Sequence, residues 1–311
     1  MIETTKLAEH TRFVRWFFEK VMPSYGYALR EMQIELAEEA FVSMNNGSIM
    51  LAEAAVGAGK TMAYLLPAVL IRRNRLNESM LGARLPDGHP MPVLIATSSI
   101  ALQTALITDY IPALSKILIE RGLIKKPLTT AIRKGKSHYL CEHRLAEFSK
   151  TANDQALSVI APLRNRDIVD LSALKGITPS LKRSVCVGEQ CGSNCPLHEN
   201  CRYTRFIRNA NKGGFDFQVV NHNLFMADLS LRAQKKKPLI PDYQMVILDE
   251  AHKFFDAARD MYGTELTLSE LHRVVQDVKC FTLAPKQRTQ EMIRWADKIH
   301  SKSRLLFQFP N

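Results

Sequence analysis

The sequence predicts an α/β protein built around a parallel sheet, and three features of the chain support this fold class. Two short apolar segments, residues 48–53 and 244–248, are predicted to be buried strands, and they lie far apart in the chain. The first is followed by a glycine-rich turn and then by a helical pattern over 61–73. Strand and helix patterns alternate as far as Asp249, which is typical of a parallel sheet. Cysteines between the two strands indicate an inserted domain.

Composition places the chain among ordinary globular proteins with a basic surface. Its 311 residues are 46% hydrophobic and carry a net charge of +11, which favours a polyanionic partner. The chain lacks an apolar run of about 18 residues, so the sequence predicts no membrane span. Residues 1–20 contain three glutamates and lack the apolar stretch of a secretory signal. We therefore expect a cytoplasmic protein, in which clustered cysteines hold metal more often than they form disulfides.

The other predicted elements follow from periodicity and from turn-forming residues. Aromatic residues recur at helical spacing over 7–22, where we expect them to pack in the core, and a second helical pattern covers 31–42. Glycines and prolines over 82–92 predict a surface loop. After the second strand the pattern becomes helical again over 266–278 and 290–299. The sequence thus predicts helices before the sheet, around it and after it.

Residues 54–61, Ala-Ala-Val-Gly-Ala-Gly-Lys-Thr, have the composition of a phosphate-binding loop. Gly57 and Gly59 allow the backbone to curl so that its N–H groups point at phosphate oxygens, and the start of the following helix adds its dipole. Lys60 would reach the β- and γ-phosphates of a nucleotide, and the Thr61 hydroxyl would bind Mg²⁺. The loop therefore predicts a nucleoside-triphosphate site.

The second strand ends in Asp249 and Glu250, within the sequence Asp-Glu-Ala-His. An aspartate at a strand end can bind Mg²⁺, and the adjacent glutamate can orient or deprotonate the attacking water. We therefore predict that Lys60, Asp249 and Glu250 are the catalytic residues of nucleotide hydrolysis. A solvated acidic strand end is the alternative, and the glycine-rich loop makes it the weaker one.

Five cysteines lie between the two nucleotide motifs, at positions Cys141, Cys186, Cys191, Cys195 and Cys201. Four thiolates are the usual complement of a 4Fe–4S cluster or of a structural Zn²⁺. Zinc sites usually pair their ligands as CxxC, and that spacing does not occur among these cysteines. Spacing alone does not choose the metal.

Two groups of residues are candidates for binding nucleic acid. Arg202, Arg205 and Arg208 recur every three residues and would form a basic ridge on a helix, able to bind phosphates. The same pattern fits a solvated amphipathic helix. Thr97 and Ser98 follow another predicted buried strand, and their hydroxyl groups could hold a phosphate. Capping of the next helix by Ser98 or its neighbour is an equally good interpretation and is compatible with phosphate contact.

Taken together, these motifs resemble those of the DinG/XPD-like group of superfamily 2 iron–sulfur DNA helicases. The glycine-rich loop followed by Asp-Glu-Ala-His is the superfamily pattern, and the resemblance runs in order from about residue 25 to 255. Four further segments resemble the adenine-recognising element, the strand and turn that touch DNA, the segment with the first cluster cysteine, and the segment before the acidic strand. They are 30–33, 93–103, 134–141 and 219–225. One departure is Ala55, where the family usually has glycine.

The resemblance implies a RecA-like P-loop parallel sheet with an inserted cysteine-cluster domain. On it we expect a RecA-like domain over 1–133 and 213–258, an iron–sulfur domain over 134–212, and the beginning of a helical arch over 259–311. The implied cluster ligands are Cys141, Cys191, Cys195 and Cys201, with Cys186 as the alternate. The implied nucleotide-binding residues are Arg30, Gln33, Gly57, Ala58, Gly59, Lys60, Thr61, Asp249 and His252.

The resemblance also implies an ATP-dependent DNA helicase that moves 5′ to 3′ and uses ATP, Mg²⁺ and a 4Fe–4S cluster. Its partner would be single-stranded or forked DNA, in DNA repair or in a defence system. Such enzymes need a second RecA-like domain that supplies an arginine finger, and no matching motif occurs in the sequence. We therefore expect the N-terminal half of such an enzyme, which binds ATP and single-stranded DNA but needs a second domain or chain to unwind.

Two other classes of function stay open on the sequence. The first is a non-catalytic accessory module that binds ATP and DNA. The second is a nucleic-acid-binding protein stabilised by zinc instead of an iron–sulfur cluster.

Overall fold

The computed structural model describes six stretches of the chain, which are residues 2–72, 90–188, 191–192, 194–212, 214–263 and 286–306. The chain divides into two compact units, Met1–Ala257 and Ala258–Asn311. The helix predicted over 266–278 and most of the loop predicted over 82–92 lie outside the described residues. In the described part, no helix combines the length and the apolar character that crossing a membrane requires.

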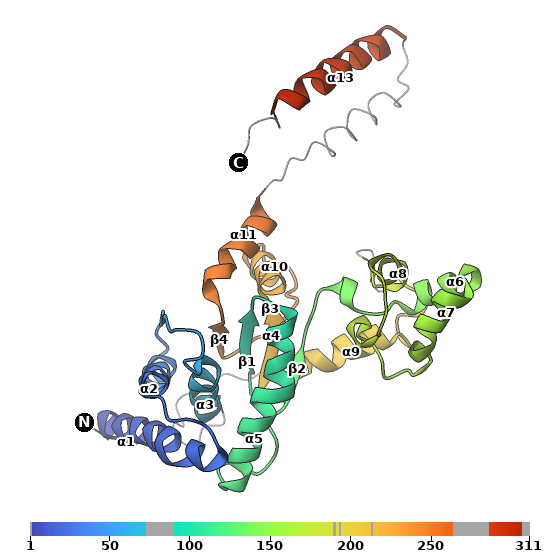
Figure 1. Cartoon of the computed structure of the whole chain (residues 1–311). Helices are drawn as coiled ribbons and strands as arrows, with labels where there is room; N and C mark the ends of the chain where they lie inside the picture. Colours follow the sequence, from blue (N-terminus) through green and yellow to red (C-terminus); the bar gives the residue numbers. More distant parts are fainter. Residues whose placement is uncertain are drawn as a thin grey trace. The chain divides into compact units, whose positions relative to one another are not determined.

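The first unit contains a four-stranded parallel sheet (Figure 1). Its strands are β1 (Val93–Thr97), β2 (Thr130–Ile132), β3 (Phe217–Asn221) and β4 (Met245–Leu248). Their order is β2-β3-β1-β4, and each neighbouring pair runs parallel. The two central strands, β1 and β3, are almost wholly buried, as strands covered on both faces must be. The predicted α/β class with a parallel sheet is therefore confirmed.

Helices make up most of the remaining described structure. Those that accompany the sheet are α1 (Ile2–Trp16), α2 (Glu31–Asn46), α3 (Lys60–Arg72), α4 (Ile100–Ala105), α5 (Ile111–Glu120), α10 (His222–Ala233) and α11 (Phe254–Tyr262). Those of the cysteine region are α6 (Glu142–Thr151), α7 (Asp154–Ile160), α8 (Pro179–Val185) and α9 (Arg202–Asn211). The second unit contains α13 (Lys286–Leu306), which includes the helix predicted over 290–299.

Short 3₁₀- or π-helical turns connect these elements. They are η1 (Phe17–Val21), η2 (Met22–Tyr25), η4 (Leu106–Tyr110), η5 (Lys136–His138), η6 (Ala161–Arg164), η7 (Leu171–Ala173) and η8 (Ala251–Lys253).

One large core joins the N-terminal helices to the sheet. Phe17 of η1, Phe41 of α2, Leu65 of α3 and Ile95 of β1 are all fully buried in it. The aromatic spacing of the N-terminal segment predicted this packing. Because α2 packs along α3 and both contribute to this core, the start of α3 is held in a fixed place beside the sheet.

The prediction of a buried strand at 48–53 is wrong. This segment has no regular secondary structure, and Ile49 and Leu51 are almost fully exposed. An apolar segment becomes a strand only where a neighbouring strand takes its hydrogen bonds, and no described strand pairs with it. The strand predicted at 244–248 is present as β4, but Val246 and Leu248 are each 37% exposed. β4 lies at the edge of the described sheet, which explains this exposure.

The cysteine region, residues 134–212, has a hydrophobic core separate from that of the sheet. Leu140, Leu163, Leu171 and Val185 are its most deeply buried members. A segment that forms its own core is what an insertion between two strands of a sheet requires. The bounds of the iron–sulfur domain stay a prediction.

Candidate functional site

The glycine-rich turn adopts the backbone that a phosphate-binding loop needs. Gly57 and Gly59 both have φ of 83°, in the left-handed region that favours glycine, and α3 begins at the next residue, Lys60. Ala55 is outside the set of described residues with positive φ, so its methyl group meets no backbone strain. The departure from the family pattern at Ala55 is therefore tolerated by the loop.

Lys60 lies between the loop and the end of β4. Its ammonium donates a hydrogen bond to the carbonyl of Ala54 at 3.2 Å and forms an ion pair with Oε1 of Glu250 at 3.5 Å. Both charged side chains are about one third exposed or less. The fold therefore brings together a lysine and a carboxylate that the sequence separates widely, as the two motifs predicted.

Asp249 and Glu250 form the turn that ends β4. The backbone N–H of Asp249 donates to the carbonyl of Ala96 at 2.9 Å, which extends the pairing of β4 with β1. Glu250 follows with φ 55° and ψ 47°, a left-handed conformation that is strained for a residue with a side chain. Backbone strain of this kind is concentrated at functional sites.

Burial raises the pKa of the Asp249 carboxyl, and the negative charge of Glu250 raises it further. Tyr64 and Lys60 oppose this shift, through a hydrogen bond and a positive charge respectively. Two adjacent carboxylates with an unfavourable environment are stabilised when a cation binds beside them.

Tyr64 is a residue of this site that the sequence prediction missed. Its hydroxyl donates to Oδ2 of Asp249 at 3.4 Å, and the Thr61 hydroxyl is a second hydrogen-bonding neighbour. Burial, followed by the nearby Asp249 charge, raises the pKa of Tyr64. The signal was available, because Tyr64 is four residues after Lys60 and therefore lies on the same face of α3.

Gln33 contacts the phosphate loop directly. Its side-chain amide donates to the carbonyl of Gly59 at 2.8 Å, and the side chain is buried. A Cβ atom at Gly59 would collide with this amide, so the loop needs glycine there for space as well as for its φ. Arg30, the other residue of the predicted adenine-recognising pair, has an exposed side chain at the start of α2.

Two histidines flank the acidic turn. His252, predicted to contact nucleotide, is mostly exposed, and its Nδ1 lies 3.6 Å from Oε2 of Glu250. His222 was missed by the site prediction. It is buried, its Nε2 lies 3.0 Å from the carbonyl of Asp249, and its ring meets Phe254 edge-on. Burial lowers the pKa of His222, and the contact of its ring with the Asp249 carbonyl helps to hold the turn in place.

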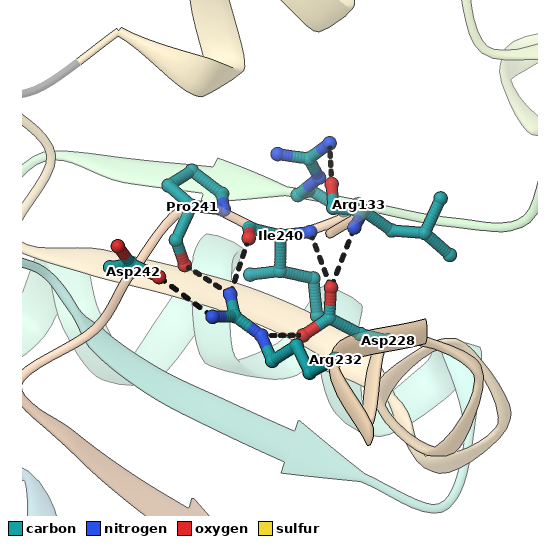
Figure 2. A network of polar contacts seen from close by, with 7 residues as sticks. Arg133, Asp228, Arg232, Ile240, Pro241 and Asp242 are labelled. Carbon is teal, nitrogen blue, oxygen red and sulfur yellow. Dashed lines mark hydrogen bonds and ion pairs between the residues drawn. The ribbon is translucent and has the colours of Figure 1, made fainter. Parts of the chain in front are cut away.

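A buried polar network holds the segment that leads into β4 (Figure 2). The carboxylate of Asp228, fully buried on α10, accepts hydrogen bonds from the backbone N–H groups of Leu239 and Ile240 at 2.6 and 2.8 Å. It also accepts one from Nε of Arg232 at 2.6 Å, and Arg232 in turn pairs with Asp242 at 2.7 Å. These contacts fix the chain just before the strand that ends in Asp249.

The same segment is connected to the end of the cysteine region. Arg133, which follows β2, donates to the carbonyl of Leu239 and to Oδ1 of Asn211, each at 2.5 Å. Asn211 is the last residue of α9. A single buried arginine therefore contacts both the cysteine region and the approach to β4.

Four of the five cysteines line one pocket, and they are Cys141, Cys191, Cys195 and Cys201. His143, His198 and Tyr203 also line it. Burial raises the pKa of the Cys191 thiol, and the neighbouring thiols of Cys141, Cys201 and Cys195 add to the shift. The four cysteines that the resemblance favoured therefore lie near one another.

Cys186 lies apart from this pocket. It is buried in the core of the cysteine region, and its thiol contacts the carbonyl of Arg183 at 3.6 Å. Of the two cysteines that competed for one ligand position, the fold thus places Cys191 in the pocket and Cys186 in the core.

The sulfur atoms do not converge on one point. Among the described residues, no group of three or more His, Cys, Asp or Glu side chains is arranged to hold a single metal ion. A structural zinc site places four ligands about 2.0–2.3 Å from one ion. The pocket therefore contains thiol groups, which are suitable metal ligands, but they are not arranged as the ligands of a single zinc ion would be.

The structure separates the three arginines of the predicted basic ridge. Arg202 is 4% exposed, forms an ion pair with Glu142 at 2.6 Å, and donates to three backbone carbonyls at 2.9–3.1 Å. These contacts leave it unable to reach phosphate, so the prediction that Arg202 binds DNA is not supported by its placement. Arg205 and Arg208 are exposed, and Arg208 pairs with Glu199 at 3.2 Å.

The side-chain hydroxyls of Thr97 and Ser98, which were predicted to contact phosphate, are also shielded from solvent. Thr97 ends β1 and is fully buried, and Oγ of Ser98 is shielded from solvent. Ser99 caps α4, because its hydroxyl accepts a hydrogen bond from the N–H of Leu102 at 3.2 Å. Helix capping, placed at Ser99, accounts for this segment.

Comparisons with known proteins identify relatives among bacterial DNA enzymes. The chain is 28% identical to the ATP-dependent DNA helicase YoaA of Escherichia coli over 292 residues, which cover 88% of this chain and 41% of that protein. It is 28% identical to the ATP-dependent helicase DinG of Mycobacterium tuberculosis over 79% of this chain and 37% of that protein. The 3′-5′ exonuclease DinG of Bacillus subtilis is 28% identical over 81% of this chain and 25% of its own length.

The chain spans less than half the length of these three relatives. No protein-family model matches it.

Proposed function

We propose, from the relationship to the DinG/XPD-like helicases that these matches support, that this chain is the nucleotide-binding part of an ATP-dependent DNA helicase. The observation that carries the proposal is the convergence of Lys60, Glu250 and Asp249. The side chains of Lys60 and Glu250, which are far apart in the chain, lie 3.5 Å from each other. They are next to a glycine-rich loop whose backbone suits phosphate binding. A lysine at a glycine-rich loop beside two carboxylates that follow a strand is the set of groups that a nucleoside-triphosphate site uses.

In this proposal each residue of the site has one role. The loop N–H groups and Lys60 bind the phosphates, Thr61 and Asp249 hold Mg²⁺, and Glu250 orients or deprotonates the attacking water. The bound Mg²⁺ would neutralise charge on the β- and γ-phosphates. Gln33, with Arg30 and His252 beside the loop and the acidic turn, would contact the rest of the nucleotide.

The ion pair with Glu250 and a bound phosphate would use the same ammonium group of Lys60. A γ-phosphate carries more negative charge than one carboxylate and competes for the same ammonium. When Lys60 turns to phosphate, the Glu250 carboxylate loses this cation, keeps His252 at 3.6 Å from its other oxygen, and can accept a proton from water. Nucleotide binding and release of the catalytic carboxylate are then the same event.

The cysteine pocket is proposed to hold a 4Fe–4S cluster on Cys141, Cys191, Cys195 and Cys201. All four line one pocket, and the donors present are thiols, which suit iron–sulfur clusters and zinc alike. A cluster of several atoms accepts ligands spread around a pocket, whereas one zinc ion needs them at a common distance from a point. The resemblance favours the cluster, and Cys186, which is buried in the core of the cysteine region, is left out of the proposed ligand set.

DNA is proposed to bind as a single strand or fork, with Arg205 and Arg208 contacting its phosphates. Both are exposed on one helix of the cysteine region, next to the proposed cluster pocket. The 5′-to-3′ direction and a role in DNA repair or defence rest on the resemblance alone. An arginine finger from a second RecA-like domain or chain would complete the ATP site.

The proposal is tested with the 311-residue chain and fluorescently labelled DNA. We expect the chain to bind single-stranded DNA with an affinity that falls steeply as salt rises, and to leave a forked duplex intact in the presence of ATP and Mg²⁺. A chain that did not bind DNA would contradict the DNA-binding part of the proposal. Unwinding by the chain alone would contradict the need for a second domain.

A further inference from the structure

The Tyr64 hydroxyl lies near both proposed magnesium ligands, Thr61 and Asp249. Tyr64 is on α3, one turn after Thr61, and its hydroxyl donates to Oδ2 of Asp249 at 3.4 Å. Thr61 is its other hydrogen-bonding neighbour. Thr61 lies in the first turn of α3, which begins at Lys60, and Asp249 directly follows β4, which ends at Leu248, so the two residues belong to different elements.

From this contact we propose that Tyr64 is a positioning residue that sets the spacing of Thr61 and Asp249 for a magnesium–nucleotide complex. The inference rests on the proposed function, because it needs the site to bind Mg²⁺ and nucleotide. It extends that function to a residue outside the phosphate loop and the acidic box. Tyr64 itself binds neither the metal nor the nucleotide.

The physical reason is the strict geometry that Mg²⁺ demands. Mg²⁺ requires near-ideal octahedral coordination with oxygen atoms at about 2.0–2.1 Å, and it usually takes only one or two protein ligands beside water and phosphates. A carboxylate that can rotate freely meets this geometry less often. A hydrogen bond to one oxygen of Asp249 restricts that rotation and leaves the other oxygen free for the metal.

The other groups that face Asp249 cannot do the same work. Lys60 donates a hydrogen bond to the Ala54 carbonyl and forms an ion pair with Glu250. Its ammonium would have to move to bind the phosphate of a nucleotide. The imidazole of His222 contacts the backbone carbonyl of Asp249 and not its carboxylate. The Tyr64 ring packs against the main core, so its hydroxyl is held in place while the rest of the site changes partners.

The substitution Tyr64→Phe removes only the hydroxyl and keeps the packed ring. The test measures equilibrium binding of a fluorescent, non-hydrolysable ATP analogue to the 311-residue chain, once with Mg²⁺ and once with a chelator. We expect the Tyr64→Phe variant to match wild type in the chelator and to bind about three- to tenfold more weakly with Mg²⁺, the size of one lost hydrogen bond. Tyr262→Phe, an exposed tyrosine of α11, is the matched control and should behave as wild type.

A merely structural role would move binding equally with and without Mg²⁺, or lower the thermal unfolding temperature of the free protein, and either result overturns the proposal. Unchanged Mg²⁺ dependence in Tyr64→Phe also overturns it. A double-mutant cycle with Asp249→Asn adds a second readout. The loss caused by Tyr64→Phe should vanish once Asp249 is replaced, because the hydroxyl acts through that carboxylate.

Failure of the proposed function has a different signature. If the wild-type chain bound no nucleotide in either condition, the nucleotide site itself would be wrong and the role of Tyr64 would fall with it. If wild type bound nucleotide and gained affinity with Mg²⁺, while Tyr64→Phe gained as much, only the role of Tyr64 would be rejected.

Discussion

The ammonium of Lys60 lies 3.5 Å from Oε1 of Glu250, so the lysine of the glycine-rich loop and the proposed catalytic carboxylate form an ion pair. The pair joins the first residue of α3 to the residue after Asp249 at the end of β4. A phosphate bound at the loop would compete with Glu250 for this lysine. Binding of a nucleotide phosphate to Lys60 must therefore offset the loss of this ion pair.

Removing the charge of Glu250 should favour nucleotide binding. In Glu250→Gln the ammonium of Lys60 is no longer neutralised, and we expect ATP to bind as tightly as to wild type or up to about fivefold tighter, because a partly exposed ion pair contributes up to about 1 kcal/mol. Calorimetric titration measures this directly. Glu120→Gln, in an exposed pair on α5, is the control, and a large loss of affinity in Glu250→Gln would show that the carboxylate helps to hold nucleotide.

Asp249 should make stability depend on pH in a defined direction. Its folded pKa is raised, by burial and then by Glu250, so the folded state holds the proton more tightly than the unfolded chain. The resulting stabilisation is complete below the ordinary aspartate pKa of about 3.9 and is lost as pH rises through the folded pKa. At pH 7 without Mg²⁺, Asp249→Asn should therefore raise the Tm.

The same comparison at lower pH provides the check on this cause. The advantage of Asp249→Asn over wild type should shrink as pH approaches 4, where the wild-type carboxyl is itself protonated. Glu35→Gln, on an exposed position of α2, should show no such trend. A Tm difference that stayed constant with pH would point to packing and not to charge.

Substitution of a pocket cysteine and substitution of Cys186 should have different effects, the first on metal binding and the second on stability. If the pocket holds the proposed 4Fe–4S cluster, Cys201→Ala should remove iron and the broad absorption of the cluster, because Cys201 lines that pocket. Cys186→Ala should keep both and lower the free energy of unfolding by about 1–2 kcal/mol, since a buried side chain is truncated. Metal analysis and denaturant unfolding measure the two effects. A colourless protein with one bound zinc per chain would instead support a zinc site.

The arginines of α9 should also separate, into one that stabilises the fold and one that binds DNA. Arg202→Ala removes the short ion pair with the mostly buried carboxylate of Glu142 and leaves the largely exposed Arg166, at 3.8 Å, as its neighbouring cation, which we expect to cost about 3 kcal/mol. Arg205→Ala, three residues later on the exposed face, should leave stability within about 0.5 kcal/mol. It should weaken single-stranded DNA binding and lower the salt slope by about 1. Equal effects of the two substitutions on DNA binding and stability would refute this division.

Those residues of the candidate site that belong to local sequence motifs could be predicted from the sequence. A glycine-rich turn before a helix and an acidic pair after a strand are local patterns, and a magnesium–nucleotide complex needs residues of both at one place. For that reason the meeting of Lys60 with Glu250 followed from the motifs. The choice of Cys191 over Cys186 followed from the resemblance and agrees with the pocket.

Features that depend on contacts between distant parts of the chain were not predicted from the sequence. The apolar character of residues 48–53 predicted a strand, but pairing decides strand formation, and no described strand offers an edge to that segment. Arg202 has the spacing of a surface arginine, yet Glu142 and three carbonyls bury it. Tyr64 and His222 were missed because each acts through a contact with Asp249, more than 20 residues away in the chain.

The central claim is that the loop at Lys60 and the acidic turn at Asp249 form a nucleotide site, and one binding measurement tests it most directly. A fluorescent ATP analogue is titrated with wild-type chain, with Lys60→Ala and with Lys116→Ala, whose lysine is exposed on α5. The account predicts saturable, Mg²⁺-dependent binding to wild type and to Lys116→Ala, and at least a tenfold loss of affinity in Lys60→Ala, on the order of one charge-assisted phosphate contact. Equal affinity of all three proteins would contradict it.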